Sequence, residues 1–283
     1  MTTTVGIIGA GTMGAGIAQV AAQAGCEVLL HDAAGEALTR AMERIAAGLR
    51  ERSREGTPAG THGAEALARV HPSRTTADLA AADVVIEAAF EELPVKREIF
   101  RALDGIVRPG TVLATNTSSL SITAIGALTR NPGSVIGMHF FNPAPRMKLV
   151  EIVRGSRTSD DTAERARALA LAMGKTPILC ADTPGFIVNR VARPFYGEAL
   201  RLLGEGAATA EEIDRIVRLE GGFRMGPFEL MDLIGIDVNY AVTKSVYERF
   251  FHEPRFRPHP IQERMVEAGT LGRKTGRGFY RHG

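Results

Sequence analysis

Short apolar runs alternate with longer amphipathic segments through the first two thirds of the chain. The runs have the length and the β-branched content of buried strands, which they predict over residues 5–8, 27–32, 82–88, 111–115, 134–141, 149–153 and 176–181. The segments between them predict helices, chiefly over residues 15–24, 35–55, 94–103 and 160–173, and an exposed loop over residues 56–63. Strands that alternate with helices are typical of an α/β fold with a doubly wound, mostly parallel sheet.

The pattern changes near Asp182, after which the helical period dominates. A long helix is expected over residues 186–203, with Pro194 as a candidate site for a bend. Thr209 and Glu212 have the spacing of a capping box that begins the next helix. We therefore expect two domains, an α/β domain over residues 1–182 and an all-helical domain over residues 183–283.

A glycine-rich turn joins the first strand to the first helix. Gly9, Gly11 and Gly14 have the spacing of a dinucleotide-binding loop, with Thr12 and Met13 before the last glycine. The first glycine permits a tight turn, the second lets a pyrophosphate approach the backbone, and the third allows close packing of the helix. The helix N-terminus supplies free N–H groups and positive partial charge for the phosphates.

Asp32 ends the second strand, where an acid can accept hydrogen bonds from the adenosine ribose hydroxyls. The same carboxylate would repel a 2′-phosphate, so the sequence predicts NAD rather than NADP as the cofactor. Strand, helix, second strand and terminal acid together indicate a Rossmann-like nucleotide-binding domain. FAD shares this fingerprint, but the rest of the chain does not favour it.

Composition narrows the class of protein. With 45% hydrophobic and 23% charged residues the chain is typical of soluble globular proteins, and a net charge of +2 argues against a nucleic-acid partner. Only two cysteines occur, and neither a signal peptide nor an apolar run long enough to span a bilayer is visible. The sequence therefore predicts a cytoplasmic protein with no membrane partner, and we expect no metal site.

The segment from Gly137 to Glu151 carries the most specific chemistry. His139 and Glu151 each lie within an apolar run, and Pro143 and Pro145 interrupt the segment between them. If the turn centres on Pro145, the two side chains come opposite one another on neighbouring strands. A histidine that is paired with a carboxylate is a common general base, so these residues are the candidate catalytic pair.

Further polar side chains follow strands where the nicotinamide is expected. Asn116 and Ser118 follow one strand, although a run of short polar residues is also a common helix cap. The segment from Glu87 to Glu91 ends another strand and could border the cofactor, although Glu91 and Lys96 could also form a solvated charge pair at the start of a helix. Asn189 opens the helical region and could face a cleft or solvent.

Together these residues resemble the 3-hydroxyacyl-CoA dehydrogenase family, and within it the single-function 3-hydroxybutyryl-CoA dehydrogenase type. The resemblance extends along the whole chain, through GIIGAGTMGAGIAQ, VVIEAAFEE, ATNTSSLSIT, GMHFFNPAPRMKLVE, DTPGFIVNR, GPFELMDLIGID and GRKTGRGFY. It implies NAD-dependent, reversible oxidation of an (S)-3-hydroxyacyl-CoA to the 3-oxoacyl-CoA, a step of fatty-acid metabolism. It also implies a homodimer formed largely through the helical domain.

The resemblance assigns roles residue by residue. It implies that His139 and Glu151 are the catalytic pair and that Ser118 and Asn189 contact the reacting oxygen and help to position the substrate. It matches Asp32 to the ribose-binding acid. The cofactor-proximal positions of the family match Glu91, Lys96 and Asn116.

One region departs from the family pattern. Where the family often places serine and lysine near the CoA adenine, this chain has Gly48 and Thr57. Positive charge is offered there by Arg50, Arg52 and Arg54, of which Arg50 and Arg54 are the candidates for substrate binding; a solvated helix face explains all three equally well. Two alternatives therefore stay open, namely a dehydrogenase of a non-CoA hydroxy acid or sugar acid, and a non-catalytic NAD(H)-binding protein.

Overall fold

The computed structural model describes residues 2–54 and 63–283, and the side chains of residues 52–54 are outside this description. Most of the predicted loop over residues 56–63, including Thr57, therefore lies outside the described residues. The chain divides into two compact units, Met1–Thr183 and Pro184–Gly283. The boundary between the units falls one residue after Asp182.

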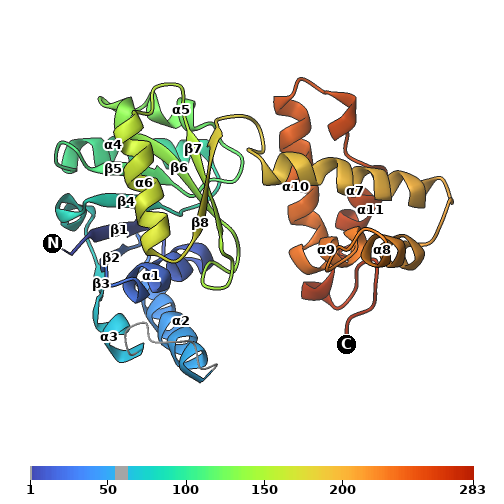
Figure 1. Cartoon of the computed structure of the whole chain (residues 1–283), viewed down its shortest axis with the longest axis horizontal. Helices are drawn as coiled ribbons and strands as arrows, with labels where there is room; N and C mark the ends of the chain where they lie inside the picture. Colours follow the sequence, from blue (N-terminus) through green and yellow to red (C-terminus); the bar gives the residue numbers. More distant parts are fainter. Residues whose placement is uncertain (1, 55–62) are drawn as a thin grey trace. The chain divides into compact units, whose positions relative to one another are not determined.

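An eight-stranded sheet forms the centre of the first unit, in the order β3-β2-β1-β4-β5-β6-β7-β8 (Figure 1). Its strands are β1 Thr4–Ile8, β2 Glu27–His31, β3 Val70–Ser73, β4 Val84–Glu87, β5 Val112–Thr115, β6 Val135–Phe140, β7 Leu149–Arg154 and β8 Thr176–Ala181. Every neighbouring pair is parallel except β6 and β7. The strand order reverses between β1 and β4, which is where such sheets bind their ligands.

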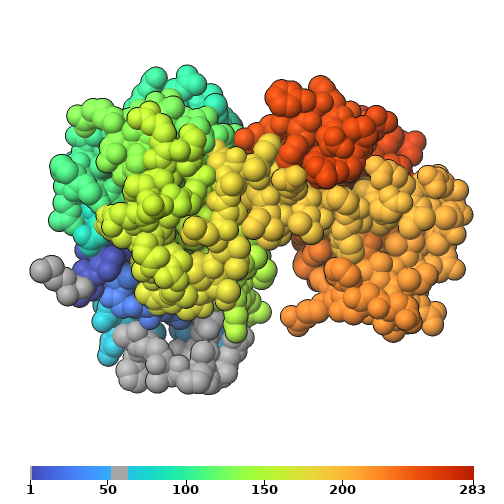
Figure 2. Space-filling view, turned by 45° about the horizontal axis from the view of Figure 1, so that its top comes forward, coloured from blue at the N-terminus to red at the C-terminus, as the bar shows by residue number. Residues whose placement is uncertain are grey.

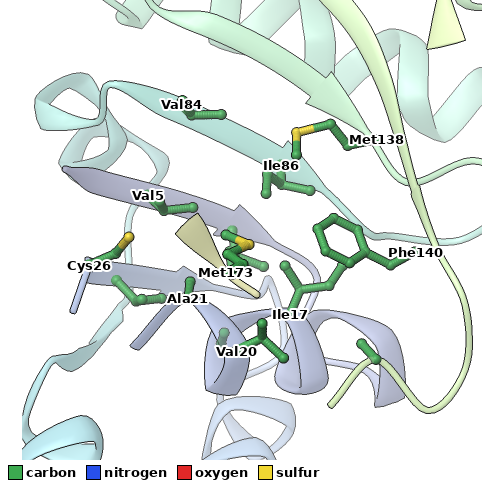
Figure 3. Close-up of a cluster of buried hydrophobic side chains, with 14 of the residues drawn as sticks. Val5, Ile17, Val20, Ala21, Cys26, Val84, Ile86, Met138, Phe140 and Met173 are labelled. Atoms are coloured by element: carbon green, nitrogen blue, oxygen red, sulfur yellow. The ribbon is translucent and has the colours of Figure 1, made fainter. Parts of the chain in front are cut away.

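Helices cover both faces of this sheet, as the alternation of strands and helices predicts. They are α1 Thr12–Gln23, α2 Gly35–Arg54, α3 Gly63–Ala68, α4 Leu93–Ile106, α5 Ile122–Gly126 and α6 Asp160–Ala172, with short 3₁₀ turns at Thr76–Ala81 and Pro132–Ser134. One core joins α1, α2 and α6 to the sheet, and Figure 3 shows Ile17 of α1 with Ile86 and Phe140 within it. On the other face, an atom added at Gly137 would meet Ile122 of α5 and Val153, so the helix packs closely there.

Strand β3 and helix α3 are among the elements of the first unit that were not predicted. Strand β3 has the sequence Val-His-Pro-Ser, in which a proline and two polar residues hide the strand pattern. It can form because it lies at the edge of the sheet and pairs only with β2. Helix α3 spans six residues, which is too short for a helical period to be recognised.

The second unit, coloured amber to red in Figure 2, consists of helices with a core of their own. Its helices are α7 Val188–Gly204, α8 Ala210–Leu219, α9 Pro227–Ile234, α10 Ile236–Arg249 and α11 Pro260–Glu267, with 3₁₀ turns at Pro254–Phe256 and Arg273–Thr275. Thr209 and Glu212 form the predicted capping box of α8, and α7 includes Pro194. Buried Asp232 holds the C-terminal segment by accepting hydrogen bonds from the N–H groups of Phe279 and Tyr280, both at 2.9 Å.

No helix in the described part of the chain combines the length and the apolar character needed to cross a membrane.

Candidate active site

The glycine-rich loop between β1 and α1 has the geometry of a phosphate cradle. Gly9 has a φ of +99°, and a Cβ there would lie 2.6 Å from the carbonyl oxygen of Ala88, so only glycine fits this turn. A Cβ at Gly14 would lie 1.7 Å from the Gly9 oxygen, so α1 can pack this closely on the loop only because residue 14 is a glycine. At Gly11 a Cβ would meet no atom within 4 Å. The backbone is therefore open where a pyrophosphate would approach, and Thr12 and Met13 begin the helix whose N-terminus faces it.

Asp32 braces this loop from the end of β2. One carboxylate oxygen accepts the N–H of Ala10 at 2.7 Å and the other accepts the N–H of Ala34 at 2.9 Å. A carboxylate has about four acceptor sites, so two remain for ribose hydroxyls. The loop and the acid thus fit a dinucleotide that binds at the switch in strand order.

His139 and Glu151 lie directly opposite one another on the antiparallel strands β6 and β7. Nδ1 of the ring is 2.7 Å from Oε2 of the carboxylate, and the two side chains are 8% and 1% exposed. This confirms the predicted opposition across the proline-containing turn. Because a carboxylate only accepts hydrogen bonds, Nδ1 carries the proton and Nε2 keeps its lone pair in the neutral ring. The pair can therefore accept one proton at Nε2 while the ring is held in place.

Strand alternation decides which way this pair faces. Met138 and Phe140, its neighbours in β6, belong to the core beneath α1 and α6. Successive side chains of a strand point to opposite faces, so His139 lies on the other face, with Gly137. A shift of the register by one residue would bury the ring in the apolar core instead.

Glu91 gathers the polar loop that follows β5. Its Oε1 accepts the N–H of Ser118 at 2.9 Å, the N–H of Ser119 at 3.0 Å and the hydroxyl of Thr117 at 2.6 Å. The Ser118 hydroxyl lies 3.3 Å from the same oxygen. Burial raises the pKa of Glu91, but Lys96 and the hydrogen bonds from Thr117, Ser118 and Ser119 outweigh it and the pKa is lowered from its ordinary value. Glu91 is thus held as the anion that orders the Ser118 loop.

Lys96 links Glu91 to a buried carboxylate, which explains why the lysine is 1% exposed. Its Nζ lies 2.7 Å from Oε1 of Glu87 and 3.4 Å from Oε2 of Glu91. Thr115 donates to the other Glu87 oxygen at 2.7 Å. The alternative of a solvated charge pair for Glu91 and Lys96 is therefore wrong for the lysine. The sequence placed Glu87 at the start of a segment that could border the cofactor, but it did not predict the buried pairing of Glu87 with Lys96.

Asn116 connects this cluster to the strand that carries His139. Its N–H donates to the Glu87 carbonyl at 2.7 Å, and its Oδ1 accepts the N–H of Phe140 at 2.9 Å. The backbone and the side chain of Asn116 together therefore join the ends of β4, β5 and β6. Asn189 belongs to the second unit, where it is half-buried in the first turn of α7.

A pocket of about 310 Å³ opens beside α1, α2 and the segment that connects β6 to β7. Its cationic lining residues are Arg44 and Arg146, and the latter pairs with Glu51 at 2.6 Å. Gly48 also lines it, and a Cβ there would lie 2.5 Å from Oε1 of Gln19. A side chain at position 48 would therefore require the end of the Gln19 side chain to move.

Arg50 and Arg54 are the arginines that the sequence offered for substrate binding. Arg50 is exposed and is not among the residues that line this pocket, and the side chain of Arg54 lies outside the described residues. Within the described ranges no group of three or more His, Cys, Asp or Glu side chains could hold a metal ion.

Comparison with known proteins identifies the family of both units. The model of the 3-hydroxyacyl-CoA dehydrogenase NAD-binding domain matches residues 4–183, and the model of the C-terminal domain of that family matches residues 185–282. The chain is 53% identical to the 3-hydroxyadipyl-CoA dehydrogenase of Escherichia coli over 98% of its own length, but spans only 58% of that relative. It is 43% identical to a probable 3-hydroxybutyryl-CoA dehydrogenase of Deinococcus radiodurans, over 98% of this chain and 99% of the relative.

A solved structure agrees with these matches. The (S)-3-hydroxybutyryl-CoA dehydrogenase of Ralstonia eutropha superposes with a TM-score of 0.95 at 44% identity, and the match covers 100% of both chains. Its resemblance to this chain confirms the expected combination of a Rossmann-like, mostly parallel sheet with a helical C-terminal region. NAD is the cofactor that the matched N-terminal domain binds, and the open glycine loop and Asp32 fit it. The chain is an oxidoreductase that acts on a CH–OH group and belongs to the 3-hydroxyacyl-CoA dehydrogenase family.

Proposed function

We propose that this protein catalyses the reversible oxidation of (S)-3-hydroxyacyl-CoA, such as 3-hydroxybutyryl-CoA, with His139 and Glu151 as its catalytic pair. The observation that carries the proposal is the buried contact of 2.7 Å between the imidazole and the carboxylate on paired strands. A buried histidine with a fixed tautomer is the arrangement that general acid–base catalysis requires. NAD+, when bound, supplies the redox chemistry by accepting a hydride.

Proton transfer in this proposal runs through Nε2 of His139. In the oxidative direction the neutral ring takes the proton of the substrate hydroxyl, and in the reductive direction the imidazolium returns it. Glu151 stabilises the imidazolium because its charge lies beside Nδ1 in a site with little solvent. The carboxylate thus acts on both the orientation and the charge of the ring.

Ser118 and Asn189 are proposed to hold the reacting oxygen. A hydroxyl and an amide can donate hydrogen bonds to this oxygen, and the bonds strengthen as it acquires negative charge during reduction of the ketone. Glu91 supports Ser118 by fixing its backbone N–H at 2.9 Å. The hydroxyl bond to the same oxygen is longer, at 3.3 Å, so the hydroxyl can rotate toward a substrate at little cost.

The CoA part of the substrate is proposed to bind in the pocket beside α1 and α2. Arg44, together with Arg146 and its partner Glu51, leaves this pocket with a net positive charge that suits phosphate groups. Arg50 and Arg54 belong to α2, as Arg44 does, and remain candidates for binding phosphates that extend beyond the pocket. Replacing Arg44 by methionine is then expected to raise the KM for acyl-CoA more than the KM for NADH.

We further propose that the protein forms a homodimer through its helical unit. Ile216 and Leu219 of α8 and the nearby Phe223 are 60%, 68% and 53% exposed, which leaves an apolar surface that suits a second copy of the chain. Light scattering after size-exclusion chromatography should give a dimer for the wild type and a monomer for Leu219→Glu. A monomeric wild type contradicts this assignment.

The proposed activity is tested with NADH and a panel of 3-oxoacyl-CoA thioesters. Acetoacetyl-CoA should be reduced, whereas free 3-oxo acids and sugar acids should not be used at comparable rates. Turnover confined to free acids contradicts the proposal, and NADH binding without any turnover contradicts it in favour of a non-catalytic role. The relatives differ in the acyl group of their names, adipyl in one and butyryl in others, so the panel must include chains with and without a terminal carboxylate.

A further inference from the structure

Arg193 is a buried cation in the helical unit, one turn after Asn189 on α7. It is 5% exposed. Its Nε donates to the Asn189 carbonyl at 3.1 Å, and its Nη1 donates to the Asn239 carbonyl at 2.9 Å and to Oγ1 of Thr243 at 2.8 Å. The guanidinium is thus held against α10. The side chain extends along α7 toward the preceding turn, which contains Asn189.

This cation has no anion beside it. Among the residues that the structure describes, no carboxylate lies within ion-pairing distance of Arg193 and its Nη2 donates to no protein group. Burial lowers the pKa of Arg193 to about 10, so the group is still charged at neutral pH. The Tyr196 ring, 5.0 Å from the guanidinium carbon, offers only a cation–π contact. Buried charges are as a rule paired, so an unpaired arginine needs an explanation.

The polar cluster around Arg193 lacks an acceptor rather than a donor. Asn239, which is 1% exposed, receives a hydrogen bond at Oδ1 from Gln262 at 2.8 Å, but its Nδ2 is sealed from solvent without a protein acceptor. Nη2 of Arg193 is not among the sealed atoms of this cluster, so it is the donor that remains for a ligand. An anionic oxygen is the acceptor that this donor would take.

The distance along α7 limits how long such a ligand would be. Asn189 and Arg193 are four residues apart, so their backbones are separated by about 6 Å along the helix. In the proposed function Asn189 holds the oxygen on C3 of the acyl chain. A chain that runs roughly four bonds beyond C3 covers about 5 Å when extended. A carboxylate at the end of a short acyl chain would then reach the Arg193 guanidinium.

We infer that Arg193 is a specificity-determining residue that selects 3-hydroxyacyl-CoA substrates whose acyl chain ends in a second carboxylate. The inference rests on the proposed function, because it needs Asn189 at the reacting oxygen. Nη2 of Arg193 donates to the terminal carboxylate, and the charge of the guanidinium compensates the cost of removing that carboxylate from water. A purely structural arginine that cross-links α7 to α10 would contribute equally to every substrate.

The test compares two thioesters of equal chain length, 3-oxoadipyl-CoA and 3-oxohexanoyl-CoA, which differ in the terminal carboxylate. We expect the wild type to favour the carboxylated substrate in kcat/KM by about 10- to 100-fold, the size of a hydrogen bond to a charged group. Arg193→Met should abolish this preference by raising KM for the carboxylated substrate alone. A contact that is equally strong in the bound substrate and in the transition state changes KM and leaves kcat unchanged. Arg193→Lys should retain part of it.

The matched control is Arg201→Met, which removes an arginine of the same helix that pairs with Glu198 at the surface. It should leave the preference unchanged. An equal loss on both substrates in Arg193→Met overturns the inference and leaves the proposed function intact. If Arg193→Met does not fold, the wild-type ratio decides, and a ratio near or below one overturns the inference. Failure of the wild type to reduce either substrate contradicts the proposed function itself.

Discussion

Replacing Glu151 by glutamine separates the charge of the carboxylate from its shape. Glu151 is 1% exposed and its Oε2 lies 2.7 Å from Nδ1 of His139. Glutamine has the same length and can still accept the Nδ1 proton, so the orientation of the ring should survive while the stabilisation of the imidazolium is lost. A hydrogen bond to a charged group contributes about 1.5–3 kcal/mol, and each 1.4 kcal/mol is a factor of ten. We therefore predict that kcat falls by about 10- to 150-fold.

The assay is NADH-dependent reduction of acetoacetyl-CoA, with the affinity for NADH measured separately by fluorescence titration. NADH affinity should not change, because Glu151 contacts the proton-transfer group and not the dinucleotide loop. Glu164→Gln is the matched control, since Glu164 pairs with Arg167 on the surface of α6 and its side chain is 61% exposed. A Glu151→Gln enzyme with the kcat of the wild type would refute the reasoning, since it would show that the charge of the carboxylate does not act on the reaction.

Three further substitutions concern Asp32, Glu91 and the glycine that packs against Asp232. Asp32→Ala should weaken NADH binding and narrow the preference for NADH over NADPH, because the acid both accepts from ribose and repels a 2′-phosphate; an unchanged ratio of the two dissociation constants contradicts this. The pKa of Glu91 is lowered, so its contribution to stability is present above the ordinary range of a glutamate and is lost as the pH falls through the lowered value. The difference in unfolding free energy between wild type and Glu91→Gln should therefore stay constant from neutral pH to about pH 5 and shrink in stronger acid. A difference that grows in acid would contradict this prediction. Gly278→Ala places a Cβ 2.1 Å from Oδ1 of Asp232 and should destabilise the helical unit by about 2–4 kcal/mol in chemical unfolding. Gly283→Ala, where the Cβ meets no atom, is its control.

The sequence contained the pattern of the sheet because its central strands are buried on both faces. Runs such as Val84–Glu87 and Val112–Thr115 are short and apolar, and the glycine-rich turn after β1 has a fixed spacing. The opposition of His139 and Glu151 was also predictable, since prolines mark the turn and both polar residues interrupt apolar runs. Local sequence decides features of this kind.

Other features depend on contacts that local patterns do not contain. Strand β3 needs β2 beside it, and the burial of Lys96 follows from Glu87, nine residues earlier on another element. The pocket residue Arg146 approaches Glu51 only because the segment after β6 lies against α1 and α2. The surroundings of Arg193 come from α10, about fifty residues away in sequence. Arg50 and Arg54 were the substrate candidates near Gly48, whereas the arginine of this helix that lines the pocket is Arg44, which the sequence did not single out.

The substitution His139→Gln shows whether this ring moves the proton of the reaction. Glutamine keeps a polar group beside Glu151 but cannot accept and return a proton, so acetoacetyl-CoA reduction should fall by about a hundred- to ten-thousand-fold while NADH binds as in the wild type. The measurement is the single-turnover rate of NADH oxidation in the ternary mixture, together with the NADH dissociation constant. A variant that binds NADH normally and loses turnover is the result that the account predicts. A variant that turns over at close to the wild-type rate would contradict the assignment of His139 as the group that handles the proton.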